Sequence, residues 1–177
     1  SAVATMGGTV LMNAGGMRGI KYGVTRDYLL GLEIVLPSGE VMNTGGVTAK
    51  DVTGYDLTRL ICGSEGTLAV VTKIIVRLLP KPKTRRTMQA IYNRIDDAGT
   101  TVAKIIAAGI IPAALELMDS QIIKAVEDFA HLGLPLDAEA VLLIDVDGDP
   151  ETVEKQAKVV GDFCKAHGAR DVKVSQS

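Results

Sequence analysis

Residues 5–23 read Thr-Met-Gly-Gly-Thr-Val-Leu-Met-Asn-Ala-Gly-Gly-Met-Arg-Gly-Ile-Lys-Tyr-Gly, and glycines bracket a short apolar segment within this stretch. These glycines are Gly7, Gly8, Gly15, Gly16, Gly19 and Gly23. Glycine lets a ligand approach the backbone without a Cβ in the way, and main-chain N–H groups can then donate to phosphate oxygens. The pattern is therefore typical of a backbone that wraps a phosphate-bearing ligand. The same glycines also suit a set of tight turns around a buried segment.

Length and composition limit the class of protein. The 177 residues suffice for one domain of ordinary size or two small ones, and 47% hydrophobic residues allow a packed core. A net charge of −2 gives no electrostatic footprint for nucleic acid, so no nucleic-acid partner is expected. There is no apolar run long enough for a transmembrane segment. The chain starts at Ser1, without a methionine and directly before the glycine-rich stretch, which indicates an internal fragment of a longer protein.

Cysteine and histidine residues indicate neither a metal site nor a catalytic group. Cys62 and Cys164 lie far apart without metal or redox spacing, so we interpret them as small apolar residues in a reducing, cytoplasmic protein. His131 and His167 are expected at helix ends, where the helix dipole favours them. No catalytic residue is therefore assigned from the sequence.

Acidic residues of the second half have mainly structural interpretations. Asp145, Asp147 and Asp149 alternate near a strand end, but they lack the distal Glu of an EF-hand, so a metal site is the weaker alternative. Glu116 and Asp119 either orient this region or cap the helix that follows.

The first half of the chain is rich in glycine, with 13 of the 19 glycines at or before Gly66. Hydrophobic patterning and turn signals predict strands over Leu29–Leu36, Glu40–Thr44 and Leu68–Leu79, and a short helix over Tyr55–Ile61. Pro80-Lys81-Pro82 then predicts a domain boundary, because proline fixes φ and removes a backbone donor.

The second half alternates strand and helix patterns. Strands are predicted over Arg86–Tyr92, Pro112–Leu117, Ala140–Asp147 and Val172–Val174, with helices over Asp96–Ala108, Asp119–Ala130 and from Pro150 to His167. This order favours an α+β fold whose second part is a ferredoxin-like α/β sandwich.

Six motifs occur in an order that identifies a family. They are Met-Gly-Gly-Thr-Val-Leu-Met-Asn-Ala-Gly-Gly (6–16), Lys-Tyr-Gly (21–23), Gly-Leu-Glu-Ile-Val-Leu-Pro-Ser-Gly-Glu (31–40), Thr-Gly-Tyr-Asp-Leu (53–57), Gly-Ser-Glu-Gly-Thr-Leu (63–68) and Leu-Leu-Pro-Lys-Pro (78–82). The set resembles the flavoprotein subunit of bacterial glycolate oxidase and the FAD-linked D-lactate and D-2-hydroxyglutarate dehydrogenases, which are vanillyl-alcohol oxidase-type flavoenzymes. Segments 110–119 and 136–143 resemble the family's next region. Thr9 and Ala69 depart from the family's usual Asn and Gly without removing a charge.

The resemblance implies a domain organisation. Residues 1–82 would form the C-terminal part of an FAD-binding domain, and residues 83–177 the first part of a ferredoxin-like substrate cap domain, truncated at its end. The family's first FAD-binding loop would precede Ser1.

The resemblance also implies cofactor-binding residues in two segments. The glycine-rich opening would face the pyrophosphate, ribityl chain or flavin ring, and the segment from Glu65 to Val71 would hold the adenosine side. The residues implied are Thr5, Gly7, Gly8, Asn13, Ala14, Gly15, Gly16, Tyr22, Gly23, Glu65, Gly66, Thr67 and Val71. Glu65 could instead be a surface turn residue, and Tyr22 could fill the core.

The function that follows from the resemblance is the FAD-dependent oxidation of a 2-hydroxy acid, of the glycolate or D-lactate class, to the 2-oxo acid. The enzyme would be the parent protein, with FAD as cofactor, a small 2-hydroxy acid as substrate and other oxidase subunits, including an iron–sulfur protein, as partners. It would be cytoplasmic, or peripheral to the inner membrane through those subunits. The alternative is a non-catalytic ferredoxin-like module for sensing or subunit contact.

Overall fold

The chain folds into two compact units, which are described separately. The computed structural model describes residues 3–48 and 50–175. The first unit contains the chain up to Gly16 together with Gly23–Pro80, and the second contains Met17–Tyr22 together with the chain from Lys81 onward. The short segment Met17–Tyr22 therefore belongs to the second unit although both its flanks belong to the first, a discontinuity that the sequence patterns did not predict.

The first unit is built on a three-stranded antiparallel sheet with the order β2-β1-β3. Its elements are α1 (Met6–Leu11), the 3-10 helix η1 (Thr25–Tyr28), β1 (Leu29–Val35), β2 (Val41–Gly45), α3 (Leu57–Ile61) and β3 (Val70–Val76). Pro37-Ser38-Gly39 turns the chain between β1 and β2, and Gly39 has a φ of 86° that glycine accommodates. The predicted hairpin is confirmed.

A small hydrophobic core holds this unit together. Leu32 and Ile34 of β1 pack with Val10 of α1 and Ile61 of α3, and each is at most 5% exposed. Burying such side chains contributes about 1.5–3 kcal/mol each. The core thus fixes α1, which contains Gly7 and Gly8, against the sheet.

The second unit contains a four-stranded antiparallel sheet with the order β5-β6-β4-β7. Its elements are α2 (Gly19–Tyr22), β4 (Thr84–Tyr92), α4 (Ile95–Ala107), β5 (Ala114–Asp119), α5 (Ser120–Ala130), β6 (Ala140–Gly148), α6 (Pro150–Ala166) and β7 (Ala169–Val174). Numbering only the strands of this sheet, the order is 2-3-1-4, which is the order of a ferredoxin-like sandwich. The predicted α+β fold class is confirmed, and α5 is an extra helix between the second and third strands.

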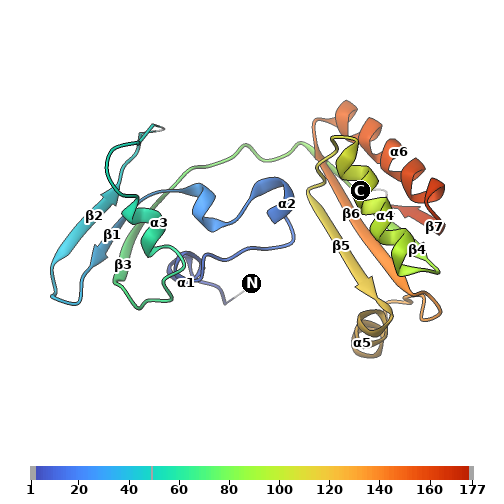
Figure 1. The fold of residues 1–177 in the computed structure, drawn as a ribbon, viewed down its shortest axis with the longest axis horizontal. Coiled ribbons are helices and arrows are strands. Elements are labelled where there is room, and N and C mark those ends of the chain that lie inside the picture. Colours follow the sequence, from blue (N-terminus) through green and yellow to red (C-terminus); the bar gives the residue numbers. More distant parts are fainter. Residues whose placement is uncertain (1–2, 49, 176–177) are drawn as a thin grey trace. The chain divides into compact units, whose positions relative to one another are not determined.

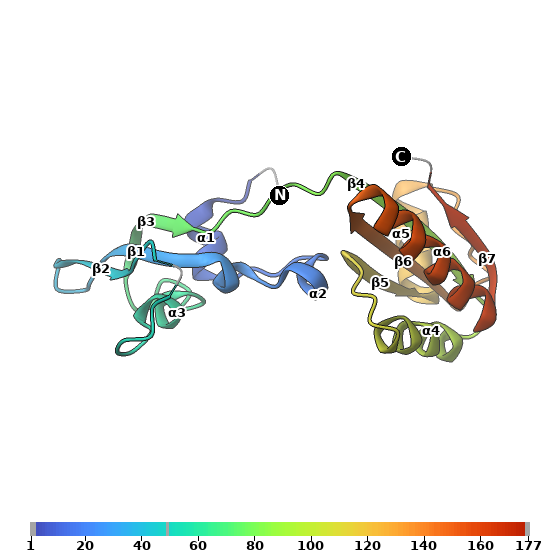
Figure 2. The ribbon, with the colours of Figure 1, turned by 90° about the horizontal axis from the view of Figure 1, so that it is seen from above.

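Alternation along the strands puts a core on each face of this sheet. Ala140, Leu142 and Ile144 of β6 pack in the larger core with residues of α4 and α6. Figures 1 and 2 show α4 and α6 against the sheet. Val141 points to the other face and packs with Ile123 of α5. Both faces of β6 are therefore buried, as its continuous apolar pattern requires.

Several element boundaries differ from those predicted by one to three residues, and those of the short helix and of β3 show why. The short helix begins at Leu57 and not at Tyr55, because the Asp56 carboxylate accepts a hydrogen bond from Arg59 N at 2.9 Å and caps the first turn. The strand predicted over Leu68–Leu79 is limited to Val70–Val76, which is the part that pairs with β1. Pro80–Pro82 carries neither helix nor strand.

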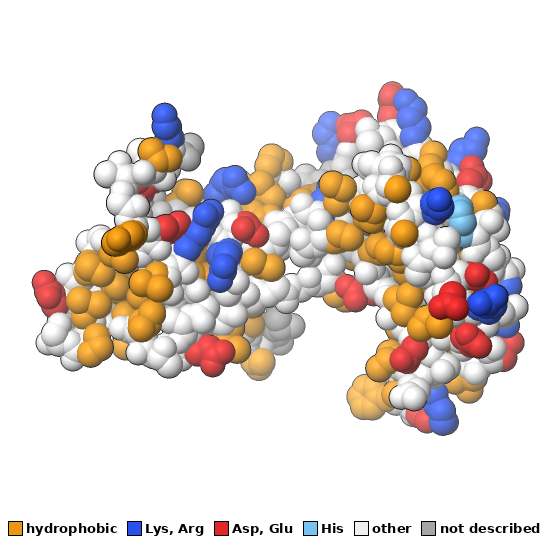
Figure 3. Space-filling model, in the orientation of Figure 1, with side chains coloured by type: hydrophobic (Ala, Val, Ile, Leu, Met, Phe, Trp, Pro, Cys, Tyr) orange, Lys and Arg blue, Asp and Glu red, His pale blue; other side chains and the backbone are white. Residues whose placement is uncertain are grey.

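The surface carries charges of both signs. On the face shown in Figure 3, Lys and Arg side chains are interspersed with Asp and Glu over the second unit. Within the described residues, no helix is long and apolar enough to cross a membrane.

Candidate functional site

The two segments implied to bind the cofactor lie next to each other in the first unit. Gly63 N donates to Val10 O at 3.0 Å, and Glu65 N donates to Leu11 O at 2.9 Å. The buried Cys62 thiol donates to Val10 O at 3.3 Å. These bonds hold the turn from Gly63 to Thr67 against the end of α1, although more than 50 residues separate the two in sequence.

The start of α1 is capped by its own residues. The Thr5 hydroxyl accepts from Gly8 N at 3.1 Å, and the Thr9 hydroxyl donates to Thr5 O at 2.8 Å. A Cβ at Gly8 would lie 3.1 Å from the Thr5 hydroxyl, whereas a Cβ at Gly7 would meet nothing within 4 Å. Thr5 and Gly8 thus have a local structural role, and Gly7 faces open space.

The turn after α1 is fixed by the entry to η1. Asn13 has a left-handed φ of 45°, and its side-chain oxygen accepts from Arg26 N at 3.0 Å. Ala14 O accepts from the Thr25 hydroxyl at 2.7 Å. The side chain of Asn13 is therefore already used inside the protein.

The two glycines of the second pair, Gly15 and Gly16, differ in the space available to a side chain. A Cβ at Gly15 would lie 3.1 Å from Val24 Cγ1, whereas a Cβ at Gly16 would meet nothing within 4 Å. Within the described part of the chain, the N–H groups of Gly15 and Gly16 donate no hydrogen bond. This leaves two backbone donors beside an open position.

Gly23 and Tyr22 each make contacts within the protein that account for their residue type without a ligand. Gly23 has a φ of 76°, and a Cβ there would clash with the Asp27 carboxylate, which accepts from Val24 N at 2.7 Å. The Tyr22 hydroxyl donates to the Asp147 carboxylate, with 2.8 Å to each oxygen. Whether Tyr22 also contacts a flavin stays a prediction.

The turn around Glu65 offers polar groups. Glu65 and Gly66 have φ values of 54° and 75°, and the Thr67 hydroxyl closes the turn by donating to Ser64 O at 2.6 Å. Glu65 is exposed, with no side-chain partner among the described residues. The Ser64 hydroxyl oxygen is buried and also lacks a partner there. Val71 pairs with Ile34 in the β1–β3 ladder and packs half-buried against the core.

These observations provide a test of whether FAD fits the first unit. A dinucleotide needs close backbone approach, N–H donors for its phosphates and acceptors for its ribose hydroxyls. Open space at Gly7 and Gly16 allows close approach to the backbone. The N–H groups of Gly15 and Gly16 donate no hydrogen bond among the described residues and are available to phosphate oxygens. The free Glu65 carboxylate is available to ribose hydroxyls. The residues present fit the cofactor, although Thr5, Asn13, Gly15 and Gly23 have internal roles as well.

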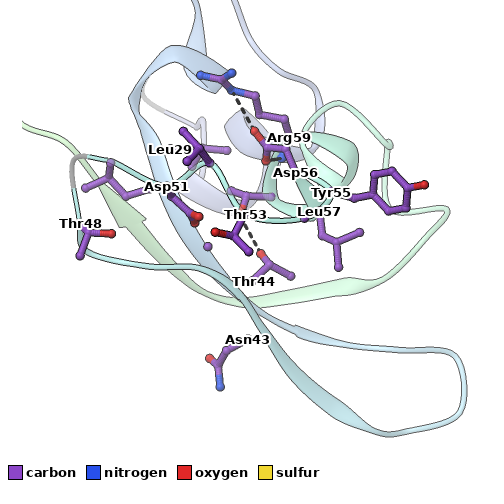
Figure 4. A pocket seen from close by; sticks show the side chains of 15 residues that line it. Leu29, Asn43, Thr44, Thr48, Asp51, Thr53, Tyr55, Asp56, Leu57 and Arg59 are labelled. Atoms are coloured by element: carbon purple, nitrogen blue, oxygen red, sulfur yellow. Dashed lines mark hydrogen bonds and ion pairs between the residues drawn. The ribbon is translucent and has the colours of Figure 1, made fainter.

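A pocket that the sequence patterns did not assign lies elsewhere in the first unit, among β1, β2, α3 and the loop before α3. It encloses about 400 Å³. The Thr44 and Thr58 hydroxyls are hydrogen-bonded at 2.9 Å in its wall. Figure 4 shows the Tyr55 side chain pointing away from Thr44. The motif Thr-Gly-Tyr-Asp-Leu (53–57) was the available signal, but nothing in its residue types specified a pocket.

The histidines and cysteines lie where they were expected. His131 and His167 are the C-caps of α5 and α6, and Cys62 and Cys164 are buried. Within residues 3–48 and 50–175, no three metal-ligating side chains come together.

The acidic residues have structural partners. Asp119 caps α5 by accepting from Ile122 N at 2.8 Å, which confirms the capping interpretation. Asp145 accepts from the Thr87 hydroxyl at 2.6 Å, and Asp149 pairs with Lys83 at 3.1 Å. Asp147 binds Lys21 and Tyr22, a contact across more than 120 residues that local patterns could not indicate.

Two family models match the chain. The model described as FAD linked oxidases, C-terminal domain, matches residues 81–177, and an FAD binding domain model matches residues 1–45.

Curated relatives and a solved structure agree with these matches. Glycolate oxidase subunit GlcD of Bacillus subtilis is 53% identical over 99% of this chain and 37% of that protein. GlcD of Escherichia coli K12 is 44% identical over 97% of this chain and 34% of that protein. D-lactate dehydrogenase of Anaerostipes hadrus is 36% identical over 98% of this chain and 38% of that protein. The fold is similar to that of alkyldihydroxyacetonephosphate synthase, with a TM-score of 0.76 and 18% identity over 97% of this chain and 33% of that one.

The chain thus spans just over a third of the length of these curated relatives. Since the C-terminal-domain model alone covers more than half of the chain, the protein belongs to the family of FAD-linked oxidases.

Proposed function

We propose that this chain is part of an FAD-dependent oxidoreductase that converts a 2-hydroxy acid to the corresponding 2-oxo acid. The observation that carries the proposal is the adjacency of the end of α1 and the turn from Gly63 to Thr67, with Gly7 and Gly16 facing open space. The names of the relatives, glycolate oxidase subunit and D-lactate dehydrogenase, support the substrate class.

The first unit would hold the cofactor through main-chain groups. The N–H groups of Gly15 and Gly16 would donate to phosphate oxygens, and the Glu65 carboxylate would accept from ribose hydroxyls. Bound FAD would supply the redox chemistry by accepting a hydride from the substrate. Gly7, Gly66 and Thr67 would shape the walls beside it, and the first unit would thus act as part of the FAD-binding domain.

The second unit would act as part of the substrate cap domain. No catalytic base or carboxylate-binding cation is assigned to this chain. Lys21 pairs with Asp147, and His131 and His167 terminate helices. Oxidation also needs a base near the substrate hydroxyl, which other parts of the parent protein would provide.

We further propose that the parent protein works in the cytoplasm with other oxidase subunits, including an iron–sulfur protein. The word subunit in the names of the GlcD relatives supports an assembly. Affinity purification of the tagged parent from its own host, followed by mass spectrometry and iron analysis, tests this part. Recovery of the protein alone would contradict it.

The full-length protein tests the enzymatic proposal. We expect flavin to co-purify and a dye acceptor to be reduced with glycolate, D-lactate or D-2-hydroxyglutarate. A flavin-loaded protein that is inactive towards every 2-hydroxy acid would contradict the substrate class, and a flavin-free protein would favour the non-catalytic ferredoxin-like module.

A further inference from the structure

Arg26, in the 3-10 helix η1, contacts both segments of the first unit that are proposed to bind the cofactor. Its backbone N donates to Asn13 Oδ1 at 3.0 Å, just after α1. Its guanidinium group borders Gly63, where an added Cβ would lie 3.8 Å from Arg26 Nη2 and 3.2 Å from Asn13 Cβ. Gly63 begins the turn that is hydrogen-bonded to the end of α1. The guanidinium group therefore lies beside the place where the two segments meet.

The backbone of η1 is held against the glycine-rich opening by contacts within the first unit. The Thr25 hydroxyl and the Thr25 N both donate to Ala14 O, at 2.7 and 3.2 Å. Gly15 and Gly16, whose N–H groups are proposed to bind phosphate oxygens, directly follow Ala14 in the chain. Arg26 thus occupies a fixed position next to this run of residues.

The positive charge of Arg26 is not neutralised within the part of the chain that the structure describes. Arg26 is exposed, and its guanidinium group makes no hydrogen bond or ion pair with any of residues 3–48 and 50–175. By contrast, Arg59 of the same unit pairs with Asp56 at 3.6 Å, and the Arg77 guanidinium lies 5.5 Å from the centre of the Tyr28 ring. The guanidinium group of Arg26 is therefore available to an anionic ligand.

A guanidinium group in this position suits a phosphate. Its planar fork of N–H donors matches two oxygens of a phosphate group, and charge-assisted hydrogen bonds are roughly twice as strong as neutral ones. Within FAD, the pyrophosphate carries the negative charge at neutral pH, whereas the oxidised flavin ring, the ribityl chain and the adenosine are uncharged. The pyrophosphate is thus the part of FAD that gains most from an unpaired arginine.

We propose that the guanidinium group of Arg26 binds the pyrophosphate of FAD, beside the N–H groups of Gly15 and Gly16. The inference rests on the proposed function, and it adds a residue outside the two segments that the resemblance implied. It gives Arg26 a role in cofactor binding and none in hydride transfer.

Arg59 offers a matched control in the same unit. It is also an arginine, and it lies in the wall of the pocket next to α3, apart from the two cofactor segments. Its backbone N caps α3 through Asp56, and this bond remains when the side chain is changed. Arg59→Met therefore removes the same charge from the same unit without touching the proposed site.

The experiment titrates the flavin-free full-length protein with FAD, with ADP, which contains the pyrophosphate without the flavin, and with riboflavin, which contains the flavin without phosphate. We expect Arg26→Met to raise the Kd for FAD and for ADP by about tenfold or more and to leave the Kd for riboflavin within about twofold of wild type. Arg26→Lys, which keeps the charge, should bind FAD within about fivefold of wild type, and Arg59→Met within about twofold. Added salt should weaken FAD binding less in Arg26→Met than in wild type, because the charge that salt screens has been removed.

The outcomes separate this inference from the proposed function. If wild type binds FAD and Arg26→Met binds it equally well, the inference is wrong and the proposed function stands. An equal loss of FAD affinity in Arg59→Met, or an equal loss of riboflavin affinity in Arg26→Met, also overturns the inference. Arg26→Met that unfolds at a lower temperature without flavin and keeps its FAD affinity would mean that the guanidinium group binds another part of the parent protein. A wild-type protein that binds no FAD contradicts the proposed function, and this inference with it.

Discussion

Gly15 and Gly16 are neighbours in the chain but differ in what a side chain would meet. A Cβ at Gly15 approaches Val24 Cγ1 to 3.1 Å, whereas a Cβ at Gly16 has open space. We expect Gly16→Val to change the free energy of unfolding by less than about 0.5 kcal/mol yet to weaken FAD binding by tenfold or more, since its side chain occupies the space proposed for the ligand. Gly15→Val should cost about 1–3 kcal/mol through overpacking. Thermal unfolding and FAD titration measure both, and a Gly16→Val protein with wild-type FAD affinity would be the contrary result.

The carboxyl group of Asp147 makes stability depend on pH. Burial pushes the pKa of Asp147 up, while hydrogen bonds from Lys21 and Tyr22 push it down, and the net pKa lies below the ordinary 3.8. A carboxyl whose folded-state pKa is lowered stabilises the fold above its unfolded pKa and loses this contribution as the pH falls through the folded pKa. The stability difference between wild type and Asp147→Asn, about 3–5 kcal/mol at pH 7 for a buried pair that loses one partner, should therefore shrink below about pH 4. Urea unfolding at several pH values measures it, and a difference that grows on acidification would oppose the account.

Helix α5 provides a test at the scale of a secondary-structure element. Ile123 is fully buried against Val141 and Ile91, whereas its neighbour Ile122 is 50% exposed. Ile123→Ala should cost about 2–5 kcal/mol, and Ile122→Ala should change stability by less than about 0.5 kcal/mol. Denaturant unfolding of the two variants compares them directly. Similar losses would mean that α5 does not pack on the sheet through Ile123.

Most elements of this fold could be predicted from sequence because their signals are local. The apolar run of β6, the cap at Asp119 and the Asp149-Pro150 start of α6 each act within a few residues. The grouping of Met17–Tyr22 with the second unit could not be predicted, because its partners, such as Asp147, lie far along the chain. The glycine pattern likewise indicated a ligand, but it could not distinguish Gly15 from Gly16. A Cβ at Gly15 would contact the Val24 side chain, whereas a Cβ at Gly16 would meet open space.

At the scale of the whole molecule, the chain spans just over a third of its curated relatives, and FAD needs donors from more than one wall of its site. We expect the 177-residue chain alone to lose FAD on gel filtration and to show no turnover with glycolate, D-lactate or D-2-hydroxyglutarate in the presence of added FAD and a dye acceptor. The full-length protein serves as the positive control. If the isolated chain bound FAD stoichiometrically, the part of the FAD site that it contains would be sufficient for binding, which would contradict this expectation.

The most direct test of the central claim is the visible flavin spectrum of the full-length protein under anaerobic conditions. We expect a flavin absorption band in the purified protein that bleaches on addition of a 2-hydroxy acid such as glycolate or D-lactate, because bound FAD would accept the substrate hydride. Bleaching should be lost in Gly16→Val together with the bound flavin. A protein that lacks the band, or that keeps it unbleached with every 2-hydroxy acid while dithionite reduces it, would contradict the account.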